Sequence, residues 1–80
     1  MNKKVLILKS PSTTIKIHSE YMIVNSLTHS EVVAFRYIDE LYINKTISIS
    51  PSHLIKLASL FKVFFIDHHG YILASIRLES

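Results

Sequence analysis

Three side chains that commonly bind metal ions stand together near the end of this 80-residue chain: Asp67, His68 and His69. They follow an apolar run at residues 63–66 and precede Gly70, the only glycine of the chain. A carboxylate and two imidazoles could hold a divalent ion and activate water for hydrolysis. The same residues also suit the polar tip of a β-hairpin, where glycine is free to adopt a positive φ. The segment therefore poses two hypotheses, a hydrolytic metal centre and a turn.

The metal hypothesis corresponds to a known class of enzyme. This segment resembles the Asp-His-His signature of a superfamily of metal-dependent phosphoesterases. A site for two divalent ions needs several more carboxylates from other strands. Upstream, the chain offers no Asp-x-Asp arrangement and only four acids, Glu20, Glu31, Asp39 and Glu40. The chain is also much shorter than such an enzyme. The hairpin is the favoured interpretation, and a phosphoesterase fragment stays as the less favoured alternative.

The other residues that could do chemistry do not form a catalytic pattern. We expect exposed positions for three histidines in predicted turns or at the start of a helix, namely His18, His29 and His53. Four tyrosines could stack on bases but more often pack against neighbouring side chains: Tyr21, Tyr37, Tyr42 and Tyr71. We interpret the adjacent acids Asp39 and Glu40 as a turn, since neighbouring strand residues point to opposite faces and cannot work as an acid/base couple.

Composition limits the class of protein. A chain of 80 residues builds one domain with one core, and its 49% hydrophobic and 19% charged residues exclude disorder. It has no cysteine, which excludes disulfides and thiolate metal sites and fits the cytoplasm. Apolar runs are too short for a membrane helix or a signal peptide.

A net charge of +3 mildly favours an anionic partner. Such an apolar small domain should also expose hydrophobic surface, so we expect a second copy or a neighbouring domain to cover it.

Alternation of apolar and polar residues predicts short strands along most of the chain. The candidate segments are residues 4–9, 13–19, 21–26, 31–37, 41–44, 46–50, 63–67 and 71–77. Between them, residues 18–20 suit a hairpin turn. One segment has helical spacing instead, with Leu54, Leu57, Ala58 and Phe61 on one stripe. Ser50 is placed as its N-cap and Pro51 as its first residue.

These elements predict a single domain over residues 1–80 of the α+β class, predominantly β. The expected architecture is a small two-sheet β-sandwich of about seven short strands, with one helix at about residues 51–61 closing an end.

The order of these parts resembles the N-terminal β-domain of the CRISPR-associated endonuclease/integrase, Cas protein one. The likeness is most specific over residues 37–76. It rests on the short strand with Ile38, Leu41 and Ile43, the β-branched and serine segment 47–50, the helix from Pro51, the strand and turn 64–67, and the segment 70–73. One departure is the missing glycine between the helix and the strand that follows it, which leaves the helix end without its favoured left-handed residue.

The resemblance implies a structural role for these 80 residues and no catalytic site within them. In that family Mg²⁺- or Mn²⁺-dependent cutting and joining of DNA belongs to a helical C-terminal domain. The resemblance therefore implies no catalytic residue, no metal ligand and no cofactor in these 80 residues, and it implies a hairpin turn at Asp67. It leaves the residues that contact DNA unknown. It implies dimerisation and scaffolding in an integrase that inserts new spacers into CRISPR arrays. The implied partners are a second copy, Cas protein two and DNA held by the full-length protein, with no membrane. An autonomous basic β-domain that binds nucleic acid remains the alternative.

Overall fold

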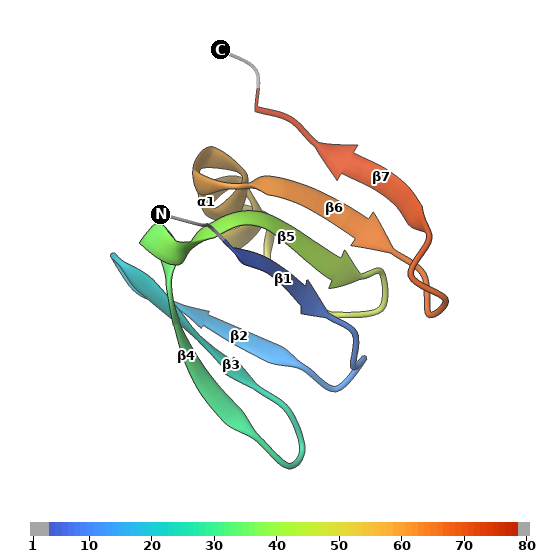
Figure 1. The fold of residues 1–80 in the computed structure, drawn as a ribbon, viewed down its shortest axis with the longest axis horizontal. Coiled ribbons are helices and arrows are strands. Elements are labelled where there is room, and N and C mark those ends of the chain that lie inside the picture. The colour runs from blue at the N-terminus through green and yellow to red at the C-terminus, as the bar shows by residue number, and fades with distance from the viewer. Residues whose placement is uncertain (1–3, 79–80) are drawn as a thin grey trace.

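Seven strands form two separate sheets in the computed structural model, which describes residues 4–78 (Figure 1). The four-stranded sheet has the order β1 (Lys4–Leu8), β5 (Ile38–Asn44), β6 (Lys62–Ile66) and β7 (Ile72–Ile76). The three-stranded sheet has the order β2 (Thr14–Ile17), β3 (Tyr21–Asn25) and β4 (Ser30–Ala34). A 3₁₀ turn, η1 (Phe35–Tyr37), and one helix, α1 (Pro51–Leu60), complete the fold. The predicted class, two sheets with one helix, is confirmed.

Strand directions follow from the lengths of the connections. β1 and β6 both run parallel to β5, whereas β7 returns antiparallel to β6. Parallel neighbours need a long crossover. The segment with α1 supplies it between β5 and β6, and the whole three-stranded sheet lies between β1 and β5 in the chain. The β2–β3–β4 sheet is an antiparallel meander, and its first turn at residues 18–20 was predicted.

The helix begins and ends for identifiable reasons. Ser50 accepts a hydrogen bond at its side chain from the His53 backbone N–H, at 3.3 Å, and Pro51 occupies the first turn. The helix stops at Leu60 because Phe61 is extended, with φ −133° and ψ 166°. The helix therefore ends without a left-handed residue, so the chain needs no glycine at this position. The predicted end at residue 61 is one residue too far.

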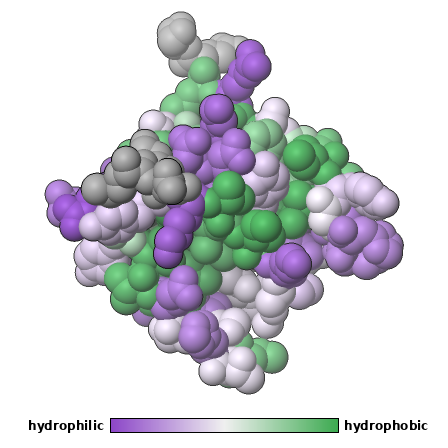
Figure 2. Space-filling model, in the orientation of Figure 1, coloured by the Kyte–Doolittle hydropathy of each residue, from purple (hydrophilic) through white to green (hydrophobic). Residues whose placement is uncertain are grey.

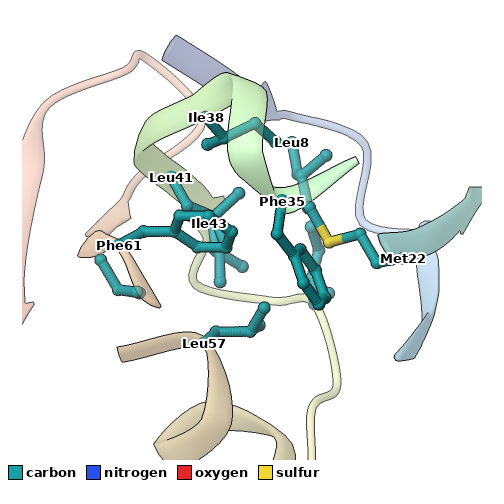
Figure 3. Packing of buried hydrophobic residues seen from close by; sticks show 10 residues of the cluster. Leu8, Met22, Phe35, Ile38, Leu41, Ile43, Leu57 and Phe61 are labelled. Atoms are coloured by element: carbon teal, nitrogen blue, oxygen red, sulfur yellow. The ribbon is translucent and has the colours of Figure 1, made fainter. Parts of the chain in front are cut away.

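One hydrophobic cluster joins both sheets, η1 and the helix (Figure 3). Met22 reaches into it from β3, and Leu57 from α1; both are completely buried. The rings of Phe35 and Phe61 meet edge to face with centroids 5.6 Å apart. The predicted helical stripe is confirmed, because all four of its residues are buried or packed against this cluster. Within residues 4–78, no helix is long and apolar enough to cross a membrane.

Three details of the predicted elements are wrong. Residues 46–50 are not a strand: the Ile47 N–H bonds to the Asn44 carbonyl at 2.9 Å in a turn, and Ile47 is buried from a loop. The predicted strand at 31–37 stops at Ala34, where η1 begins. Asp39 and Glu40 do not form a turn, since β5 begins at Ile38 and includes them.

Candidate functional site

The segment 67–70 forms a tight turn between β6 and β7. The Gly70 N–H donates to the Asp67 carbonyl at 3.0 Å, and the Asp67 N–H donates to the Tyr71 carbonyl at 3.0 Å. Gly70 has φ +90°, a conformation that residues with a side chain rarely adopt. The hairpin hypothesis for this segment is confirmed.

The carboxylate of Asp67 holds this turn together. Its Oδ1 accepts hydrogen bonds from the backbone N–H groups of His69, at 2.9 Å, and Tyr71, at 3.0 Å. Partial desolvation works to raise the pKa of Asp67. The backbone bonds from Tyr71 and His69, together with the charges of His69 and His68, outweigh it and lower the pKa. The side chain therefore acts as an internal cap for the backbone.

The two histidines of the turn point into solvent. Their rings lie against each other, with centroids 3.9 Å apart and planes tilted by 41°. The four upstream acids are distributed over the β2–β3 turn, β4 and β5. Within residues 4–78, no three His, Cys, Asp or Glu side chains are grouped to hold a metal ion. The geometry gives the phosphoesterase alternative no further ligands.

The remaining histidines and most tyrosines make local contacts. The His18 ring stacks on Tyr21 across the β2–β3 turn, with centroids 4.5 Å apart. The His29 Nε2 lies 3.7 Å from a Glu31 carboxylate oxygen, and both side chains are exposed. His53 lies in the first turn of α1, as predicted. The Arg36 guanidinium lies 5.0 Å from the centre of the Tyr37 ring.

Tyr42 belongs to a row of side chains on the outer face of the four-stranded sheet. It stacks on Phe64 of β6, with ring centroids 4.8 Å apart, and its hydroxyl donates to Glu40 at 3.1 Å. Burial, the hydrogen bond to Glu40 and the charge of Glu40 raise the pKa of Tyr42. The strand register places Ile7 on one side of Tyr42 and Ser75 beyond Phe64. This face of the sheet is therefore partly aromatic and apolar.

Hydrophobic side chains reach the surface over the four-stranded sheet. Figure 2 shows apolar residues gathered across the part of the molecule where Figure 1 draws this sheet, interrupted by hydrophilic side chains. β1 exposes Val5 and Ile7. At the other edge, Tyr71 is 70% exposed, Ile72 56% and Leu73 53%. Neighbouring exposed apolar residues of this kind are typical of surfaces that contact another protein.

The four strands at sheet edges differ in charge. β1 contains Lys4, β2 contains Lys16 and β4 contains Glu31, whereas β7 has the uncharged sequence ILASI. Charged residues on an edge strand hinder pairing with another chain. β7 is the edge without that protection. Alternation predicted this segment as the return strand of a hairpin, and its lack of charge is a further signal in the sequence that it forms an open edge.

An open groove lies beside η1. Its volume is about 620 Å³, and its walls come from the β2–β3 turn, the end of β4, η1 and the end of α1. Glu20 and Arg36 give it one charge of each sign, and Phe35 and Phe61 form part of its apolar floor.

Several solved structures have the fold of this chain, and two of them are described here. One is a CAS1 protein from Thermotoga maritima, with a TM-score of 0.76, 13% sequence identity and 96% of this chain covered. The other is a partial Cas6-RT-Cas1–Cas2 complex, with a TM-score of 0.78, 12% identity and 98% covered. The chain spans 24% of the length of each matched chain. No family model matches the sequence, and no curated protein matches it.

These comparisons confirm the resemblance at the level of fold. The fold expected for the β-domain of Cas protein one, hereafter Cas1, is present over nearly the whole chain. At 12–13% identity the likeness concerns the fold, and it assigns no residue a function.

Proposed function

We propose that this chain is the β-rich scaffold domain of a Cas1-type CRISPR integrase, corresponding to the N-terminal part of such a protein. The observation that carries the proposal is the match of 96–98% of the chain to Cas1-containing structures at TM-scores of 0.76–0.78. Since this chain spans about a quarter of the length of the matched chains, we propose that catalysis belongs to a helical domain outside these 80 residues. Mg²⁺ or Mn²⁺ would be bound by that domain.

The proposed role is to pair two copies of the integrase in the cytoplasm and to brace DNA held across the pair. Exposed apolar side chains on the four-stranded sheet support pairing. The net charge of +3 is compatible with weak contact to DNA phosphates. A complex containing both Cas1 and Cas2 has the same fold in one of its chains. We therefore propose Cas2 as a further partner of the full-length protein.

Sedimentation and DNA titration test this role. We expect the purified domain to form a dimer in analytical ultracentrifugation as its concentration rises. We expect weak binding of duplex DNA that falls steeply with salt, because phosphate contacts release counterions. We expect no DNA cleavage with Mn²⁺ present. Metal-dependent cleavage by a clean preparation would contradict the assignment of catalysis to another domain.

The alternative function is an autonomous nucleic-acid-binding module. A chain that stays monomeric at high concentration and binds DNA tightly would favour it over the scaffold. The reading frame beyond Ser80 gives a second test. The proposal expects a helical domain with a glutamate, a histidine and an aspartate as metal ligands, and a CRISPR array nearby.

A further inference from the structure

A second open groove lies between the end of α1 and the chain that leaves β7 (Figure 1). Its volume is about 510 Å³, which is within the range of pockets that bind small molecules. Its walls come from the last turn of α1, from residues 61–64 and from residues 75–78. The groove is therefore large enough for a small organic ligand.

The charges that line this groove have one sign. Lys62 and Arg77 line it, and no acidic residue of the segment 4–78 does. Glu40 lies opposite Lys62 in the strand register, but it is not part of the walls, and its carboxylate accepts a hydrogen bond from the Tyr42 hydroxyl at 3.1 Å. The groove beside η1 differs, because its walls carry one charge of each sign. An anionic ligand therefore complements this second groove.

An aromatic ring in the wall indicates a second feature of the ligand. One face of the Phe64 ring stacks on Tyr42, with centroids 4.8 Å apart and planes 19° apart. On the other side of Phe64 the strand register places Ser75, and both residues line the groove. The short serine side chain leaves space beside the ring. A planar group above Ser75 would continue the stack, because neighbouring strands lie about 4.8 Å apart.

The two cations and the ring lie on the same face of the sheet. Lys62 precedes Phe64 by two residues on β6, and Arg77 follows Ser75 by two residues after β7. Residues two apart on a strand point to the same face and are separated by about 7 Å. A mononucleotide has its base and its phosphate at a comparable separation.

We propose that this groove, defined by Lys62, Phe64, Ser75 and Arg77, binds a nucleoside phosphate. The base would stack on Phe64 above Ser75, and Lys62 and Arg77 would hold the phosphate. Lysine and arginine bind phosphate through charge-assisted hydrogen bonds, and every base has a π-face that can stack on an aromatic ring. This inference does not depend on the proposed pairing of two copies.

A nucleotide fits the groove better than the two simpler ligand classes. An acidic peptide would pair with the cations but leave the open side of Phe64 uncovered. An uncharged aromatic compound would cover the ring but leave two cations without a partner. A nucleoside phosphate satisfies both features with one molecule.

Three related probes test the class of ligand: AMP, adenosine and ribose 5-phosphate. In NMR titrations of the 80-residue chain, we expect AMP to shift the backbone amides of residues 59–64 and 75–78. Adenosine lacks the phosphate and ribose 5-phosphate lacks the base, so each should bind at least about tenfold more weakly. Ribose 5-phosphate that binds as tightly as AMP would reduce the groove to an anion-binding surface and overturn the proposal. AMP shifts spread over the lysines of the other sheet would also overturn it.

Two exposed positions test the groove itself. Ser75→Leu fills the space beside Phe64 without changing the charge, and it should weaken AMP binding at least about tenfold. Its control is Ser52→Leu, an exposed serine in the first turn of α1 and outside the groove, which should bind AMP as wild type does.

Arg77→Gln removes one of the two cations, so it should weaken AMP and ribose 5-phosphate alike. Lys16→Gln, on β2 of the other sheet, makes the same change of charge and should weaken neither. Circular dichroism should show the fold retained in all four variants. Wild-type affinity for AMP in both Ser75→Leu and Arg77→Gln would overturn the site.

Discussion

Short polar side chains in this molecule hold the backbone. Asn44, buried at the end of β5, donates from Nδ2 to the Lys9 carbonyl at 2.9 Å and accepts at Oδ1 from the Thr46 N–H at 3.0 Å. Asp67 does the same for the β6–β7 turn. Asn and Asp are common in turns because their side chains can bond to the backbone a few residues away. A ligand-like residue next to a glycine is therefore weak support for a metal site.

The pKa of Asp67 gives a prediction at the scale of a residue. Because the pKa is lower in the folded state, the charged carboxylate stabilises the fold above its unfolded pKa of about 4. This contribution is lost as pH falls through the folded pKa. We expect Asp67→Asn to lower the urea midpoint at pH 7, and the gap from wild type to narrow progressively below pH 4.

The control for that experiment is Asp39→Asn, an exposed carboxylate inside β5. It should change the midpoint little at pH 7. A gap between Asp67→Asn and wild type that is the same at pH 7 and at low pH would show that the carboxylate charge does not stabilise the turn.

At the scale of secondary-structure elements, the features that depend on residues close together in the chain were the ones predicted correctly. α1 was predicted within one residue because its cap, its proline and its apolar stripe all lie within twelve residues. The turn at Asp67 was predicted because Gly70 and the polar residues before it determine it. Alternation also identified five of the seven strands closely. It extended β4 three residues too far, and it found β5 only in part.

The wrong predictions arise because strands pair with segments that are distant in the chain. Alternation shows which residues face the core but not whether their backbone has a partner strand. Ile47 is buried from a loop, so residues 46–50 looked like a strand. Asp39 and Glu40 looked like a turn because nothing nearby showed that β1 and β6 flank them. The exposure of β7 likewise depends on the order of the sheet, which local spacing does not contain.

Leu57 provides a prediction for the helix. It is completely buried, whereas Ile55, two residues earlier, is 58% exposed. Leu57→Ala leaves a cavity where the helix meets the core, and it should lower the free energy of unfolding by about 2–5 kcal/mol. Ile55→Ala is the matched control and should cost less than about 0.5 kcal/mol. Urea unfolding followed by circular dichroism measures both; similar losses would show that α1 does not dock through its apolar stripe.

At the scale of the whole molecule, one core serves two sheets. The cluster includes Leu8, Leu41 and Ile43 from the four-stranded sheet and Met22 from the three-stranded sheet. A fold set by the pattern of buried positions tolerates many different apolar residues. That tolerance accounts for a shared fold with Cas1-containing structures at 12–13% identity.

A shared core predicts that both sheets unfold together. Met22 is completely buried and reaches from β3 to the residues of the other sheet (Figure 3). Met22→Ala should lower the free energy of unfolding by about 2–5 kcal/mol, so the slowest amides of β3 and β6 should both exchange at least about tenfold faster. Amide hydrogen exchange followed by NMR measures this, with Val32→Ala, on the exposed face of β4, as the control that should change neither. Faster exchange confined to β2, β3 and β4 would mean that the four-stranded sheet is stable by itself and that the cluster is not one cooperative unit.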